Sequence, residues 1–302
     1  MAKQPHIVVV GSLNMDLVVN VNDFPQVGET KLGESISYLS GGKGANQAVG
    51  CARLGARVSM VGAVGSDAFG QQIISQLEQE GIDVSGVKQI DDVATGVASI
   101  THTPVDNSII IVAGANGRVT PHDVYEQRQK IAAADVLLVQ LEIPVDAVQE
   151  ALRIAKEAGV LTILNPAPAQ KLPIELLQLA DYMTPNEIEF QQLSGKSLDT
   201  PQYREVAADY CDKLGSSLLI TRGPEGAILY DQGAWAEAAA PKVEVKDTTG
   251  AGDCLNAAFA TMLAYGKHSD EALRLAVHAA SISVTRYGAQ DGMPTLKELS
   301  TG

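Results

Sequence analysis

Residues 135–164 read DVLLVQLEIPVDAVQEALRIAKEAGVLTIL, in which two short apolar runs flank a helical pattern. The apolar runs, 135–140 and 160–164, have the length of buried strands. Between them, apolar residues recur at helical intervals, at Val145, Val148, Leu152 and Ala155. A strand, a helix and a second strand in this order form the unit from which parallel sheets are built.

The same alternation extends along most of the chain. A helical pattern that stops before Gly81 is formed by Phe69, Ile73, Ile74 and Leu77. Further strand-like runs lie at 6–10, 57–61, 182–184 and 218–221. They are nearly continuous in apolar character, as expected for strands that are covered on both faces. The alternation predicts an α/β fold, with a doubly wound, mainly parallel central sheet flanked by helices.

Two regions interrupt this alternation with strand-like pieces that have no helix between them. The pieces lie at 17–21, 31–38, 97–101 and 108–112. The last two flank a turn with Pro104 and Asn107, so we expect a hairpin there. Because so small a sheet must pack on something, we interpret it as a lid over a site or a subunit interface. We expect one domain over 1–302, with a β lid from about 14–40 and 97–113.

The composition excludes several classes of protein. Of 302 residues, 45% are hydrophobic and 19% are charged, a balance typical of globular and not of disordered proteins. The net charge of −14 disfavours nucleic-acid binding, which needs a basic surface. No apolar run approaches the length of a membrane span, and three cysteines do not make a disulfide framework. We therefore expect a cytoplasmic protein with neither a nucleic-acid nor a membrane partner.

The strongest chemical signal is the segment DTTGAGD at 247–253, which is followed by a helical pattern that Gly266 ends. A glycine-rich turn brings backbone N–H groups to one point, and the helix dipole adds positive potential there. The segment therefore predicts an anion-binding hole. Asp253 adds a carboxylate, which suits a general base beside developing negative charge. From the residues alone, a simple helix-capping role for Asp253 is equally compatible.

A second glycine-rich segment, GGKGANQA at 41–48, also precedes a short helix, which we expect to end near Gly55. Lys43 and Asn46 supply groups that hydrogen-bond hydroxyls, although a plain strand-to-helix turn has the same sequence pattern. Neither segment is a Walker phosphate loop. The turn after the first strand reads GSLNMD, which lacks the dinucleotide-binding glycines, so a nicotinamide dehydrogenase is disfavoured.

Polar residues follow several of the predicted strands. Asn14 and Asp16 alternate along an extended segment and so face one way, which suits a polyhydroxyl ligand, with an Asx turn as the alternative. Glu142 follows a strand at the sheet edge where α/β proteins hold ligands, with a solvated loop acid as the alternative. Asn186 and Glu189 follow another strand, and helix capping is their alternative.

Other segments carry weaker signals. The segment TRGPEG at 221–226 lies between two strand-like runs, and a hairpin turn explains it. Cys254, His102, His122 and His268 do not have metal-ligand spacing, so they predict no metal cluster.

Together, these segments resemble the ribokinase-like carbohydrate kinases nearly end to end, from the first strand to Gln290. Two blocks are highly specific, GGKGANQA at 41–48 and DTTGAGD at 247–253. The supporting blocks are GSLNMD at 11–16, GAN at 114–116, QLE at 140–142, NPAPA at 165–169 and TPNE at 184–187. The resemblance implies ATP-dependent phosphorylation of the 5-hydroxyl of D-ribose.

The resemblance also implies a role for individual residues. Asp253 is implied as the base that takes the hydroxyl proton. The implied N–H donors to the transferring phosphoryl group are Gly250, Ala251 and Gly252. Besides Asp253, the implied sugar contacts are Asn14, Asp16, Gly42, Lys43, Asn46 and Glu142. The implied ATP contacts are Asn186, Thr221, Gly223, Gly226 and Gly252.

The cofactors implied by the resemblance are ATP, Mg2+ and a monovalent cation, K+. Glu189 is implied to hold Mg2+ through water. The implied cation ligands, mostly through backbone carbonyls, are Asp247, Thr249, Ser283, Arg286, Gly288 and Gly292. Gly292 offers no side-chain hydroxyl, and Val277 stands where family members often carry a polar residue near the adenine.

Two alternatives remain open. A kinase of another sugar or nucleoside, such as deoxyribose, adenosine or fructose phosphate, would carry similar motifs. Lys43 is the basic residue near Asn14, Asp16 and Asn46, which favours an uncharged sugar. A weakly catalytic sugar-binding sensor on the same fold is the second alternative, and Asp253 beside an intact glycine turn favours an enzyme. We also expect a homodimer through the β lid, since exposed lid strands favour pairing and similar proteins often pair this way.

Overall fold

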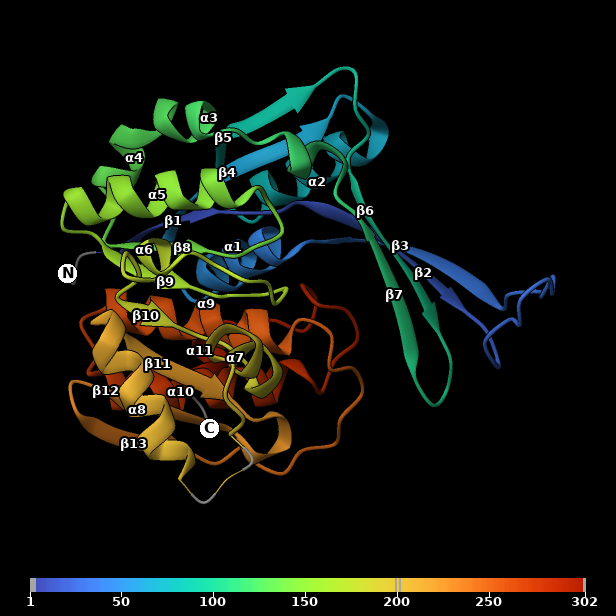
Figure 1. The fold of residues 1–302 in the computed structure, drawn as a ribbon. Coiled ribbons are helices and arrows are strands. Elements are labelled where there is room, and N and C mark those ends of the chain that lie inside the picture. The colour runs from blue at the N-terminus through green and yellow to red at the C-terminus, as the bar shows by residue number, and fades with distance from the viewer. Residues whose placement is uncertain (1–3, 199, 201, 301–302) are drawn as a thin grey trace.

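The computed structural model describes residues 4–198, 200 and 202–300, and its body is a twisted sheet between two layers of helices (Figure 1). The strands of this sheet are β1 (His6–Val10), β4 (Arg57–Gly65), β5 (Asp83–Ile90), β8 (Val136–Val139), β9 (Leu161–Leu164), β10 (Tyr182–Met183), β11 (Ser217–Thr221), β12 (Ala227–Asp231) and β13 (Ala234–Ala238). Within the described residues they form one sheet in the order β13-β12-β11-β10-β9-β8-β1-β4-β5. Pairing is parallel from β11 to β5 and antiparallel at β12 and β13. The predicted fold class is confirmed.

Helices cover both faces of the sheet because alternate residues of its central strands point in opposite directions. Ile7 and Val9 of β1 belong to one apolar cluster and Val8 and Val10 to another, and all four are fully buried. The helices over the first cluster are α1 (Lys43–Arg53), α2 (Ala68–Gln79), α9 (Ala251–Ala264), α10 (Ser269–Ser283) and α11 (Leu296–Ser300). Those over the second are α3 (Pro121–Glu126), α4 (Arg128–Ala132), α5 (Val145–Glu157), α6 (Ile174–Leu177), α7 (Glu187–Ser194) and α8 (Tyr203–Leu214).

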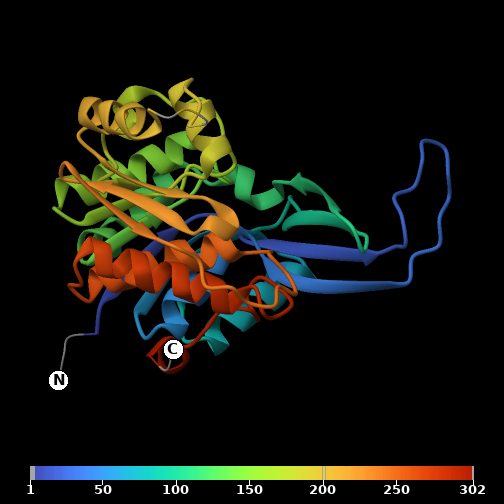
Figure 2. The same ribbon diagram turned by 90° about the horizontal axis from the view of Figure 1, so that it is seen from below.

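A second, smaller sheet projects from the body (Figures 1 and 2). Its strands are β2 (Asn14–Asn20), β3 (Ser35–Gly41), β6 (Gly96–His102) and β7 (Asn107–Val112), in the order β3-β2-β6-β7. All four predicted pieces overlap these strands, although the piece at 31–38 begins too early, since β3 starts at Ser35. β6 and β7 form the predicted hairpin. Because β2 begins at Asn14, both Asn14 and Asp16 lie on a strand, and the Asx-turn alternative is wrong.

The sequence analysis missed some elements for a physical reason. β5, with the sequence DVSGVKQI, is an edge strand whose residues are mostly exposed or half-buried, so it lacks a continuous apolar run. The sequence analysis also missed the helical pattern of apolar residues in α10. None of the helices in the described part of the chain is long and apolar enough to cross a membrane.

Candidate functional site

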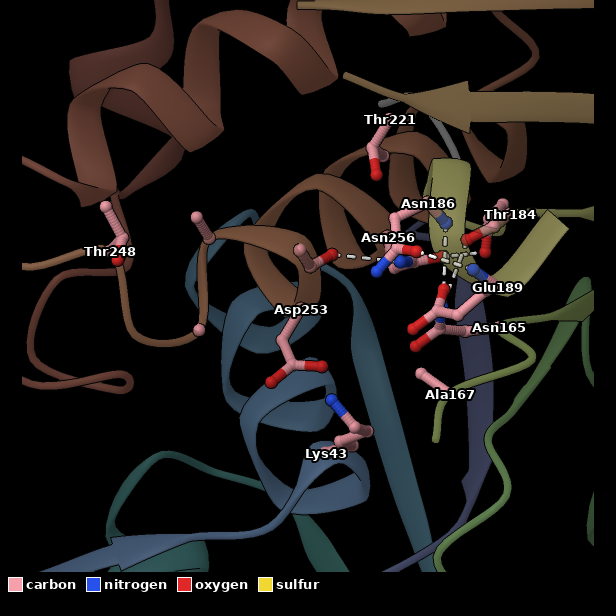
Figure 3. A pocket seen from close by; sticks show the side chains of 13 residues that line it. Lys43, Asn165, Ala167, Thr184, Asn186, Glu189, Thr221, Thr248, Asp253 and Asn256 are labelled. Atoms are coloured by element: carbon pink, nitrogen blue, oxygen red, sulfur yellow. Dashed lines mark hydrogen bonds between the residues drawn. The ribbon is translucent and has the colours of Figure 1, made fainter. Parts of the chain in front are cut away.

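A cavity of about 150 Å³ lies at the N-terminus of α9, beside the carboxyl ends of β9, β10 and β11 (Figure 3). Asn165, Thr184 and Thr221 line it from these strand ends, and Lys43 lines it from the first position of α1. The carboxyl ends of parallel strands meet at one edge of a sheet, so residues far apart in sequence converge there.

The turn that leads into α9 requires glycine at position 250. Gly250 has a φ of 75°, a left-handed conformation that other residues rarely adopt. A Cβ atom there would lie 2.7 Å from the Cβ of Ala289. The three predicted N–H donors at 250–252 differ from one another. The N–H of Ala251 already donates a hydrogen bond to the carbonyl of Thr248 at 3.2 Å. Gly252 lines the cavity, and a Cβ there would meet no described atom within 4 Å.

Asp253 lies in the first turn of α9, and only 6% of it is exposed. Both of its carboxylate oxygens accept hydrogen bonds from amides of α1. Asn46 Nδ2 donates to Oδ2 at 2.9 Å, and Gln47 Nε2 donates to Oδ1 at 3.0 Å. A neighbouring helix therefore holds this carboxylate, which simple capping of α9 would not require. Gln47 lies within the block at 41–48, but the sequence analysis gave it no role.

Lys43 brings a positive charge into this acidic site, and its amine points toward Asp253 in Figure 3. The negative charge of Asp253 raises the pKa of Lys43 despite burial, and Glu142, Glu189 and Asp16 add to this effect. Lys43 therefore remains protonated at neutral pH.

Asn14 and Asp16 lie on β2 beside this charge cluster, on the same side of the strand. Asn14 Oδ1 accepts a hydrogen bond from Asn116 Nδ2 at 2.7 Å, which fixes the orientation of the Asn14 amide. Burial, followed by the charges of Glu142 and Asp253, raises the pKa of Asp16 to about 7. The sequence analysis gave Asn116 no role, although its block GAN supported the family resemblance.

Glu142 anchors the second glycine-rich segment, so it is not a solvated loop acid. Its carboxylate accepts hydrogen bonds from Ser12 Oγ at 2.5 Å and from the backbone N–H of Lys43 at 3.2 Å. Gly42, just before α1, has a φ of 89°, and a Cβ there would lie 2.7 Å from the backbone nitrogen of Asn14. This close approach brings the start of α1 against the start of β2.

Asn186 and Glu189 form a capping box at the start of α7, so the capping alternative is confirmed for both. Asn186 Oδ1 accepts from the N–H of Glu189, and Glu189 Oε2 accepts from the N–H of Asn186, each at 2.8 Å. Both side chains also line the 150 Å³ cavity (Figure 3). Burial raises the pKa of Glu189. Capping occupies one carboxylate oxygen, which is compatible with a second role for the other.

A larger cavity of about 920 Å³ adjoins the first one. The residues that line both cavities are Asn186, Thr221, Thr248, Ala251 and Gly252. Gly223 and Gly226, around the short 3-10 helix η2 (Gly223–Glu225), line the larger cavity, as does Val277. Other apolar side chains that line it are Val243, Val245, Leu255 and Val284. This size and this mixture of groups suit a small-molecule ligand.

The residues implied as cation ligands also come together. Asp247 accepts hydrogen bonds from the N–H of Thr249 through Oδ1 and from the N–H of Gly288 through Oδ2, each at 2.9 Å. The carbonyl oxygens of Ser283 and Gly288 lie 2.8 and 3.0 Å from the point where a Cβ on Gly292 would stand. These two carbonyl oxygens therefore lie close to Gly292, and both also accept backbone hydrogen bonds, from Arg286 and Gly292 respectively.

Arg286 pairs its guanidinium with Glu298, so its side chain already has an acidic partner. Across residues 4–198, 200 and 202–300, no three His, Cys, Asp or Glu side chains form a cluster that could hold a metal ion. Among the described residues this region thus offers backbone carbonyls and single, separated carboxylates.

Comparison with known proteins gives the class. The model of the pfkB family carbohydrate kinases matches residues 4–296. The chain therefore belongs to the pfkB family of carbohydrate kinases, and the resemblance found in its sequence is confirmed.

Several similar proteins are ribokinases. The ribokinase of Bacillus subtilis (strain 168) is 43% identical over 296 residues, which cover 97% of this chain and 98% of the relative. The ribokinase of Haemophilus influenzae is 41% identical over 292 residues, covering 96% and 95%. A deoxyribokinase of Salmonella typhimurium is 33% identical over 297 residues, covering 97% of each chain.

A solved structure gives the same picture. The structure of Arabidopsis thaliana ribokinase complexed with ribose and ATP matches with a TM-score of 0.92 and 36% identity. The match covers 99% of this chain and 98% of the other.

Replacing Gly250 by alanine should destabilise the protein more than the same change at Gly266. Both glycines have positive φ, 75° and 79°, but a Cβ on Gly266 would meet nothing within 4 Å. We expect a loss of about 1–2 kcal/mol for Gly266→Ala from backbone strain. Gly250→Ala should lose roughly 1–3 kcal/mol more, because its Cβ crowds Ala289. Urea unfolding measures both, and equal losses would contradict the role given to Ala289.

Proposed function

We propose that the protein transfers the γ-phosphoryl group of ATP to the 5-hydroxyl of D-ribose, giving ribose 5-phosphate and ADP. One observation carries this proposal. A buried carboxylate, Asp253, is held by two amides at a helix N-terminus between the polar groups of β2 and a cavity of about 920 Å³. The identities of 43% and 41% to ribokinases support ribose as the sugar.

Asp253 acts as the general base. The 5-hydroxyl oxygen attacks the γ-phosphorus and its proton passes to the Asp253 carboxylate, while the bond to the bridging oxygen breaks and ADP departs. The hydrogen bonds from Asn46 and Gln47 fix the carboxylate in one orientation before the sugar arrives. A well-placed base of this kind contributes about 10²–10⁴ to the rate.

Stabilisation of the transferring group comes from the start of α9. The backbone amides of Gly250 and Gly252, together with the helix dipole, face the charge that develops on the phosphoryl oxygens. Of the three implied donors, Ala251 contributes less, because its N–H already donates to the carbonyl of Thr248. Lys43, protonated beside Asp253, adds a positive charge on the same side. In a chain of net charge −14, such local help is needed to attract a nucleotide.

The sugar lies against β2 and the start of α1. Asn14 and Asp16 share one side of the strand, and Glu142, Gly42, Lys43 and Asn46 surround the same point. The ionised carboxylate of Asp16 accepts hydrogen bonds from two hydroxyls.

The nucleotide occupies the 920 Å³ cavity, with Thr221, Gly223 and Gly226 along its wall and Asn186 at the phosphate end. Glu189 suits Mg2+, because Mg2+ keeps several waters and is often held by one carboxylate and the phosphates. When bound, Mg2+ neutralises charge on the phosphate oxygens. Glu189 lines the phosphate end of the pocket, where one of its oxygens remains outside the capping box.

A monovalent cation, K+, suits the loop of Asp247, Thr249, Ser283, Arg286, Gly288 and Gly292. The support is the convergence of the Ser283 and Gly288 carbonyls, since carbonyl oxygens are the groups that K+ prefers. A bound cation supplies positive charge next to the anion hole. Gly292 adds no hydroxyl, and a side chain there would crowd both carbonyls.

The small sheet acts as a lid and joins two copies of the chain. β7 exposes Ile109, Ile110, Ile111 and Val112, and β3 exposes Ile36 and Tyr38. Such an apolar row on an edge strand favours burial against another copy. We also place the protein in the cytoplasm, since all three cysteines are unpaired and buried, as suits a reducing compartment.

Measurement of ADP release tests the function. The compounds tested as phosphoryl acceptors are ribose, deoxyribose, adenosine and fructose 6-phosphate, each in KCl and in NaCl. We expect the highest kcat/KM with ribose and higher activity in KCl. Asp253→Asn should lower kcat by about 10²–10⁴ while ribose still binds.

Each arm of this assay has its own contrary result. A higher kcat/KM for deoxyribose or a nucleoside would show that ribose is not the preferred substrate. Near-normal turnover of Asp253→Asn would show that Asp253 is not the general base. Sugar binding without turnover would indicate a sensor. A flat response to the two salts would exclude a functional cation site.

Asp16 predicts a pH dependence of sugar binding. Its pKa of about 7 means that the ionised fraction rises roughly tenfold between pH 6 and pH 8. Because the ionised form accepts hydrogen bonds from hydroxyls better, ribose affinity should increase with pH by up to that factor. Calorimetry without nucleotide measures it. In Asp16→Asn the affinity should be lower and independent of pH, so an affinity that is flat or falls with pH in the unaltered protein refutes the role of Asp16.

Sedimentation velocity tests the lid interface. We expect a dimer for the unaltered chain and a monomer for Ile110→Asp, because a charge on the exposed face of β7 cannot be desolvated without cost. Ile174→Asp, at a residue of similar exposure on α6, serves as the control and should remain dimeric. A monomer before any substitution would contradict the proposed interface.

A further inference from the structure

Two rows of amide side chains end on the carboxylate of Asp253. In the first row, Gln76 Nε2 donates to Gln290 Oε1 at 3.0 Å, and Gln290 Nε2 donates to Asn46 Oδ1 at 3.1 Å. Asn46 in turn donates to Asp253 at 2.9 Å.

In the second row, Gln140 Nε2 donates to Gln47 Oε1 at 2.5 Å, and Gln47 donates to Asp253 at 3.0 Å. Gln47 and Gln140 are fully buried, and 3% of Gln290 is exposed. The reacting carboxylate thus lies at the meeting point of two buried amide rows.

The direction of both rows is dictated by the carboxylate. An ionised carboxylate only accepts, so Asn46 and Gln47 must each turn an N–H toward Asp253 and their carbonyl oxygens away from it. The next amide in each row must then donate, which Gln290 and Gln140 do. If an outer amide turned over, two carbonyl oxygens would face each other in a buried setting.

An unpaired atom shows that this direction is enforced. Gln140 Oε1 is buried and has no hydrogen-bond partner among the described residues. Leaving such an acceptor unpaired costs about 1–3 kcal/mol. Turning the amide over would bring its oxygen against Gln47 Oε1 instead, so the structure keeps the unpaired atom at the outer end of the row.

We propose that Gln290 and Gln140 are positioning residues for the reaction, because they lock Asn46 and Gln47 in the orientation that donates to Asp253. This inference rests on the proposed role of Asp253 as the base. Two hydrogen bonds to a charged acceptor in a buried site are strong, and amides in a row polarise one another. Gln290 and Gln140 thereby keep the carboxylate aimed at the hydroxyl without touching the sugar or the nucleotide themselves.

The test compares Gln290→Met and Gln140→Met with the unaltered protein, since methionine keeps the length of the side chain without its donor. We expect kcat to fall about 10-fold to 100-fold in each variant, as for a modest misplacement of a reacting group. KM for ATP should change less than about twofold, because neither glutamine lines the nucleotide cavity. The loss should therefore fall on kcat and leave the KM for ATP nearly unchanged, a split that a merely structural loss would not produce.

Ser216→Ala is the matched control. Ser216 is also buried, and its Oγ donates to the carbonyl of Ala180 at 2.7 Å, at the end of β11 opposite the cavity. We expect this variant to lose stability while its kcat stays unchanged. If the methionine variants do not fold, Gln76→Leu, at the half-buried end of the first row, should give a smaller loss of kcat, again with little change in the KM for ATP.

Two results would overturn the inference: a kcat like that of the unaltered protein, or a loss of kcat that comes with an equal rise in the KM for ATP and follows the loss of stability. The kinetics use whichever sugar of the panel gives the highest kcat/KM. Failure of ribose as the substrate and failure of the amide rows are therefore separate outcomes.

Discussion

The hydrogen bonds from Asn46 and Gln47 to Asp253 are the interaction on which the site depends. They join the start of α1 to the start of α9, across more than two hundred residues of sequence. A buried carboxylate must find donors, so the two helices have to pack closely. Small residues permit this, because a Cβ on Gly50 of α1 would lie 2.6 Å from the Cβ of Ala257 on α9. The close packing of α1 against α9 therefore also sets the position of the Asp253 carboxylate.

The electrostatics of the site follow from the same crowding. Asp16, Glu142, Glu189 and Asp253 all act on Lys43, whose protonated amine offsets part of their charge. Burial, and after it the repulsion from neighbouring carboxylates, raises the pKa values of Asp16 and Glu189. An acidic protein thus places two positive groups, the helix N-terminus and one lysine, where an anion is expected.

The two sheets divide the site between them. The central sheet supplies a rigid edge with Asn165, Thr184 and Thr221, whereas β2 of the small sheet carries Asn14 and Asp16. The small sheet projects from the body and exposes apolar residues (Figure 2). One half of the site is therefore built on the core of the body, and the other half on a projecting sheet.

The sequence by itself determined the fold class, the position of the glycine turn before α9 and the family, since apolar periodicity and glycine-rich blocks are local properties. It could not predict β5, which is half exposed at an edge, nor decide between a strand and a turn at Asn14. Only the tertiary structure showed that Asn186 and Glu189 cap a helix while lining the cavity, and that Glu142 anchors α1. It alone brought Gln290 to Asn46, 244 residues apart. Contacts between distant amides leave no periodic trace in a sequence, because packing of the whole chain decides which donor meets which acceptor.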